Sequence, residues 1–120
     1  MTSQGMTAGP HAIEGVVLRF AVHENRMHKG EPLYDWLLKE ASRLGIPGGT
    51  VYRGIAGYGR HGVLHEQRFF ELAADLPADV VFVCSEADAN CLVDLVERSQ
   101  LSLFYVIVPA RYGIAGAAGK

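Results

Sequence analysis

The order of the periodic segments restricts the fold of this chain more than any other feature. Residues 13–22 alternate apolar and mixed positions at period two, and residues 80–84 form an apolar run typical of a buried strand. Helical spacing follows each of them, over 33–44 and after Ser85. With two further strand-like segments, the order is βαββαβ. It predicts an α+β, ferredoxin-like sandwich with a four-stranded antiparallel sheet and both helices on one face.

Local signals predict where these elements begin and end. Proline is tolerated in a first helical turn, so Glu31-Pro32 is expected to open the first helix, and Gly45 to end it. Ser85 with Asp88 three residues later is a capping signal for the second helix. The remaining strands are expected over residues 50–58, 79–85 and 102–108.

The chain of 120 residues fits one domain, with 49% hydrophobic and 20% charged residues as in ordinary globular proteins. The domain is expected over residues 13–109, because Pro109 stops the last strand. Residues 1–12 are predicted to be a disordered tail and the Gly/Ala-rich residues 110–120 a flexible one. Residues 59–76 are expected to form a flexible insert, either a short helix or an extended arm.

Net charge and the length of the apolar runs indicate where the protein is located and which partners it lacks. A net charge of −2 offers no general attraction for nucleic acid. No apolar run is long enough to span a bilayer, and the first eleven residues lack the pattern of a signal peptide. We therefore expect a cytoplasmic protein with no nucleic-acid partner and no direct membrane insertion. Cys84 and Cys91 match no zinc or redox spacing and are predicted to be buried free thiols.

The predicted sheet has a second face that two helices cannot cover. Val17 and Ala21 lie on that face of the first strand, and the last strand is apolar on both sides. Self-association is the economical way to cover it.

The segment from Arg53 to Gly62 is the most informative for function. Four glycines and two arginines within it allow backbone N–H groups to approach an anion and supply charged donors. A bulged strand end with a flexible hairpin is the alternative. Lys29 belongs to a basic cluster before the first helix, and Arg111 follows the last strand. The candidate ligand-binding residues are Lys29, Arg53, Gly54, Gly57, Tyr58, Gly59, Arg60 and Arg111.

Catalytic and metal motifs are not apparent. The chain has no nucleophile elbow, no phosphate-binding loop and no obvious carboxylate pair, so we expect neither an enzyme nor a resident cofactor. Metal is not expected either. The alternative function is a metal-binding or metal-tolerance module that uses His28, His61 and His65. The simpler interpretation is that these are solvated loop histidines.

Several motifs together resemble the PII-like bacterial proteins of the domain of unknown function 190 family. The resemblance runs from about residue 13 to residue 108, and its motifs are Gly30–Tyr34, Gly45–Gly59, His65 and Asp75–Pro77.

The resemblance implies a homotrimer of the PII signalling and copper-tolerance superfamily. Effectors in that superfamily, often adenine nucleotides, bind in clefts between subunits, and a long loop contacts partner proteins such as transporters or enzymes. Here that loop would be residues 59–76, with Arg111 reaching a neighbouring subunit. The loop lacks a clear uridylylation tyrosine, because Tyr58 lies at its base. The hypothesis is a regulatory trimer that senses a small anionic metabolite, such as a nucleotide.

Overall fold

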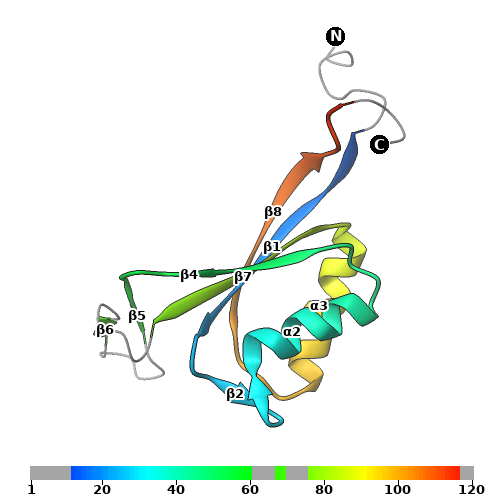
Figure 1. Ribbon diagram of the computed structural model, residues 1–120. Coiled ribbons are helices and arrows are strands. Elements are labelled where there is room, and N and C mark those ends of the chain that lie inside the picture. Colours follow the sequence, from blue (N-terminus) through cyan, green and yellow to red (C-terminus); the bar gives the residue numbers. More distant parts are fainter. Residues whose placement is uncertain (1–11, 61–66, 70–75, 117–120) are drawn as a thin grey trace.

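The computed structural model describes residues 12–60, 67–69 and 76–116. Its main sheet has four antiparallel strands in the order β4-β7-β1-β8, and two helices lie on one face of it (Figure 1). The elements of this sandwich are β1 (Ile13–His23), α2 (Leu33–Arg43), β4 (Gly49–Arg53), β7 (Pro77–Cys84), α3 (Glu86–Arg98) and β8 (Phe104–Tyr112). The predicted ferredoxin-like α+β fold is confirmed.

The core lies between the helices and one face of the sheet. Alternate residues of β1, from Val16 to Val22, are at most 4% exposed, and Leu18 is fully buried. From the second central strand, β7, Val80 and Phe82 point to the same side, and Leu37 and Leu92 meet them from α2 and α3. Period-two strands thus bury one face beneath the apolar stripes of two helices.

The predicted helix ends agree closely with the structure. The Ser85 hydroxyl accepts a hydrogen bond from the Asp88 N–H at 3.0 Å, which caps α3. Gly45 follows the C-cap of α2 with a φ of 88°, a conformation that glycine adopts without strain. Pro32 is the N-cap of α2 and so stands just before the first turn.

The second strand is shorter than predicted. A single strand over 50–58 was expected, but β4 ends at Arg53 and the chain leaves the sheet after Gly54. The Gly54 N–H donates to the Pro77 carbonyl at 2.8 Å, and a Cβ at this position would lie 2.7 Å from the Pro77 Cγ. Glycine is therefore required by a close approach, and Ile55 beyond it is 87% exposed.

Two short antiparallel pairs lie outside the main sheet. One joins β5 (Tyr58–Arg60) to β6 (Gln67–Phe69), so of the two alternatives for this segment, a short helix or an extended arm, residues 67–69 follow the extended one. The rest of the predicted insert, residues 61–66 and 70–75, lies outside the described residues, as do 1–11 and 117–120 of the predicted tails. The other pair, β2 (Met27–His28) with β3 (Glu31–Pro32), was not predicted.

The last strand is longer than predicted. It runs through Pro109 to Tyr112, so the expected stop at Pro109 and the flexible tail from 110 are wrong for residues 109–112. β8 is an edge strand, where a missing N–H need not break a ladder bond. Its end pairs with the start of β1, and together they form a ribbon that projects from the sandwich (Figure 1).

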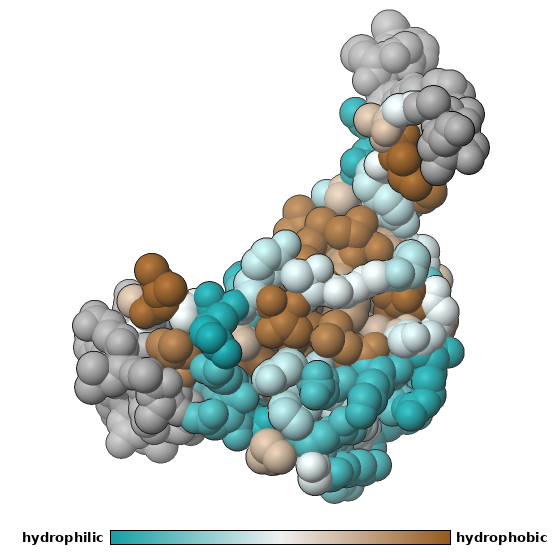
Figure 2. Space-filling view, viewed as in Figure 1, coloured by the Kyte–Doolittle hydropathy of each residue, from teal (hydrophilic) through white to brown (hydrophobic). Residues whose placement is uncertain are grey.

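The second face of the sheet, here called the open face, is apolar, and neither described helix lies over it (Figure 1). Register places Val17 opposite Val108 and Ala21 opposite Phe104 on this face. Phe104 is 68% exposed and Val108 49%. Figure 2 shows the apolar residues gathered over the sheet and hydrophilic residues over the helical side. One ion pair, Arg19 with Asp79 at 2.7 Å, lies among the apolar residues of the open face.

Two further observations concern burial. Cys84 is buried as predicted, but Cys91 is exposed on α3, so the prediction of two buried thiols is wrong for Cys91; both are free. Neither described helix is long and apolar enough to cross a membrane.

Candidate functional site

Three strand ends meet at one end of the sheet and form the root of the predicted insert. Arg53 ends β4, Glu24 follows β1, and Pro77 begins β7. The Arg53 guanidinium pairs with the Glu24 carboxylate at 2.5 Å. The Glu24 N–H donates to the Leu76 carbonyl at 2.9 Å. We call Glu24, Arg53, Gly54, Leu76 and Pro77 the insert root.

The candidate glycines of this region differ in what surrounds them. Gly54 is held against Pro77, so its backbone is already used within the chain. A Cβ at Gly57 would meet nothing within 4 Å, and the residue is exposed. The backbone at Gly57 is thus open to a ligand. Tyr58, Gly59 and Arg60 follow directly as β5, paired through their backbones with β6.

Lys29 lies at the tip of the β2–β3 hairpin, before α2. Lys29 and Gly30 have φ values of 52° and 84°, which is the type I′ geometry of a two-residue hairpin turn. Its side chain is exposed, whereas Glu31 below it pairs with Lys39 at 2.7 Å and raises the pKa of Lys39. The turn therefore presents a cation, while the carboxylate two residues further along is already paired with Lys39.

His28 is packed rather than solvated, which corrects the simpler expectation for the loop histidines. Its ring makes an edge contact with Trp36 at a centroid distance of 4.6 Å, and its Nε2 is buried without a hydrogen-bond partner. Within the described residues no three histidine, cysteine or acidic side chains come together in a way that could hold a metal. His61 and His65 lie outside those residues.

Arg111 lies at the other end of the molecule from the insert root. It pairs across the ribbon with Glu14, ten residues before Glu24 along β1. At a rise of about 3.3 Å per residue the two positions are roughly 30 Å apart. One chain therefore does not bring Arg111 to Arg53, although a neighbouring copy could.

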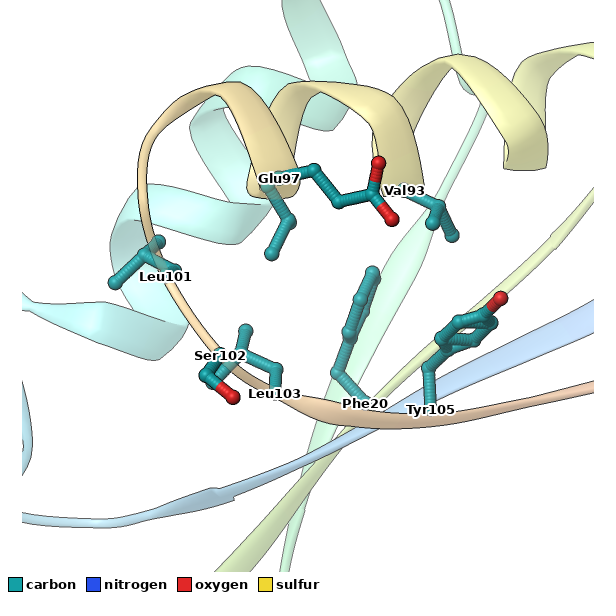
Figure 3. Close-up of a pocket in the computed structure, with 8 residues that line it drawn as sticks. Phe20, Val93, Glu97, Leu101, Ser102, Leu103 and Tyr105 are labelled. Carbon is teal, nitrogen blue, oxygen red and sulfur yellow. The ribbon is translucent and has the colours of Figure 1, made fainter.

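A cavity of about 180 Å³ lies between the end of α3 and the start of β8 (Figure 3). It is lined by Phe20, Val93, Val96, Glu97, Leu101, Ser102, Leu103 and Tyr105. None of these is a sequence-predicted site residue, and the volume is below the roughly 300 Å³ at which small-molecule sites begin. This cavity does not suit a nucleotide.

Comparison with known proteins decides the family. Residues 15–107 match the profile of the DUF190 family, described as "Uncharacterized ACR, COG1993". The chain belongs to the DUF190 family. A UPF0166 protein of Aquifex aeolicus is 36% identical over 70 residues, which are 58% of this chain and 67% of that protein. A UPF0166 protein of Methanocaldococcus jannaschii is 37% identical over 78 residues, 65% of this chain and 69% of that protein.

The insert root of this DUF190 chain contains one charged residue that sequence reasoning missed. Glu24 was not a candidate, yet it is the ion-pair partner of Arg53. The two residues are 29 positions apart, and no sequence motif contains both of them. Only the pairing of β1 and β4 with β7 brings them together. Both lie within the span of the family match.

Proposed function

We propose that this DUF190 chain is a PII-like regulatory protein of the cytoplasm. It binds a small anionic metabolite, such as an adenine nucleotide, and acts on a partner protein, for example a transporter or an enzyme, through residues 59–76. It is a sensor rather than a catalyst and needs no resident cofactor. The observation that carries the proposal is the Arg53 guanidinium, 66% exposed at the insert root and followed by the open backbone at Gly57.

The chemistry of the insert root suits a phosphate group. Arginine offers a planar set of donors that binds phosphate oxygens in pairs, and exposed backbone N–H groups add neutral donors. Gly57 allows such an approach because no atom within 4 Å would oppose even a Cβ there. Arg60 and Lys29 complete the proposed set of cations from this chain.

The proposed assembly is a homotrimer. The open face exposes Phe104 and Val108, and a contiguous apolar face is typical of a surface that another subunit covers. A closed ring covers this face on every copy. It also gives Arg111 a role, because the projecting ribbon can carry it to the insert root of a neighbour. The resemblance to PII proteins supports three subunits.

Calorimetry with ATP, ADP, AMP and cyclic AMP, with light scattering on the same samples, tests the proposal. At least one of these nucleotides should bind, and Arg53→Ala should weaken it about ten-fold or more, as for a lost hydrogen bond to a charged group. Arg43→Ala is the matched control, because Arg43 is 67% exposed and pairs with Glu40 on α2. Failure of all four nucleotides to bind at millimolar concentration would reject the nucleotide, and a monomeric mass would reject the trimer.

A further inference from the structure

We propose that Glu24 is a built-in competitor for the anion: its carboxylate holds Arg53 in the free protein and gives the guanidinium up when the ligand binds. The inference rests on the proposed anion site and adds the residue that regulates it. Nothing in the resemblance or in the family match assigns a role to Glu24.

The geometry gives Arg53 one partner among the described residues. The Arg53–Glu24 distance of 2.5 Å is that of a direct hydrogen-bonded ion pair. An anion that binds the same guanidinium must share it with Glu24 or replace Glu24. Sharing would place two negative groups side by side, so replacement is favoured.

The exposure of the pair makes replacement feasible. The Arg53 side chain is 66% exposed and that of Glu24 is 24% exposed. Water already solvates the largely exposed Arg53 guanidinium, so its pairing with Glu24 contributes little to stability. A polyphosphate that takes two hydrogen bonds from the guanidinium can therefore displace a single carboxylate. Glu24 then lowers the observed affinity for the anion, because part of the binding free energy is used to break the Arg53–Glu24 ion pair.

The backbone on either side of the pair links this exchange to the insert root. The Glu24 N–H donates to Leu76 and the Gly54 N–H, next to Arg53, donates to Pro77. Each member of the pair is thus tied to the same two-residue stretch that leads into β7. Transfer of Arg53 to a ligand removes the ion pair that joins these two anchors.

The test compares Glu24→Gln with a control of the same charge change. Glu40→Gln is suitable, because Glu40 is 20% exposed and pairs with Arg43, which is 67% exposed, on α2. Calorimetry with ATP and with inorganic pyrophosphate should show about two- to five-fold tighter binding to Glu24→Gln, the range expected for loss of one exposed pair. Glu40→Gln should bind like the wild type. In an Arg53→Ala background, Glu24→Gln should give no gain.

A second measurement needs no charge variant of Glu24. The chemical shift of the Glu24 carboxyl carbon should move, on saturation of the wild-type chain with ATP, toward its value in Arg53→Ala. A shift that stays at the free wild-type value would show that the pair persists beside the ligand.

The outcomes separate this inference from the proposed function. If the wild type binds a probe and Glu24→Gln binds no tighter, the competitor role is wrong and the anion site stands. If the gain persists without Arg53, a general charge effect replaces the competitor role. If no probe binds either chain, the proposed site fails and this inference fails with it.

Discussion

Val17 and Leu18 are neighbours on β1 and point to opposite faces of the sheet. Leu18 is fully buried beneath the helices, whereas Val17 is half-buried on the open face opposite Val108. The same contrast recurs on β7, where Phe82 is 1% exposed and Val83 is 39% exposed. Apolar residues are thus present on both faces, but the helices of the described part of the chain cover only one.

This difference separates two roles for apolar side chains. The helix-covered face stabilises the single chain, because its side chains leave water when the sandwich folds. The open face gains little until a second molecule covers it. Substitutions on the two faces should therefore affect different equilibria, folding for one and association for the other.

Leu18→Ala should have the largest effect on folding. Removal of a fully buried leucine loses its transfer free energy and leaves a cavity, at a cost of about 2–5 kcal/mol in the free energy of unfolding. Val17→Ala is the matched control one residue away and should cost less than about 1 kcal/mol in a dilute single chain. Urea unfolding followed by circular dichroism measures both. Equal costs would contradict the distinction between the faces.

The helix-covered face is also where the sequence predicts the structure best. The alternation from Val16 to Val22 and the capping signal at Ser85 are local, and local patterns survive folding when tertiary packing agrees with them. The predicted end of the last strand at Pro109 was wrong, because proline is tolerated in an edge strand. The sequence alone does not show that this strand lies at the edge of the sheet.

The candidate site was predictable only in part. The density of glycines and the presence of Arg53 identified this segment as a candidate site. The strand ends at Gly54, where the close approach to Pro77 requires glycine. The pairing of Arg53 with Glu24 arises from strand register, and no pattern in either segment encodes it. The hairpin turn at Lys29-Gly30 was missed because a lysine at positive φ is rare.

Cys84→Ser should have the next largest effect. Cys84 is fully buried on β7, so a serine hydroxyl there would lose water without a ready partner, at a cost of about 1–3 kcal/mol. Val83→Thr places a hydroxyl on the neighbouring open-face position and should cost less than about 1 kcal/mol. The same urea experiment compares them, and a similar cost for both would mean that the open face is as dry as the core.

Alkaline pH offers an independent probe of the same position. Burial, with a smaller contribution from Asp88, raises the pKa of the Cys84 thiol above its ordinary value of 9.0. The unfolded chain therefore loses this proton first, and stability should fall as pH rises from about 9 toward the folded-state pKa. Cys84→Ala should remove this part of the pH dependence, whereas Cys91→Ala, at an exposed thiol, should keep it. Unchanged alkaline unfolding in Cys84→Ala would contradict the assignment.

Asp79→Asn should have a smaller effect in the single chain. It breaks the Arg19–Asp79 pair, whose side chains are 44% and 33% exposed, so the loss should be about 0.2–1 kcal/mol. If another subunit covers the open face, the pair is desolvated and its loss should weaken association more than folding. Unfolding at several protein concentrations separates the two, and a cost that does not depend on concentration would count against burial of this pair.

Phe104→Ser should have the smallest effect on the fold and a decisive one on association. The ring is 68% exposed, so its removal should change the free energy of unfolding of a dilute chain by no more than about 0.5 kcal/mol. In an assembly that covers the open face, the same ring would be buried, and its loss should shift the mass measured by light scattering toward the monomer. Ile55→Ser is the control, since Ile55 is also a large apolar residue and is 87% exposed, but lies beyond the insert root. An unchanged mass for Phe104→Ser would show that the subunit interface does not include this end of the open face.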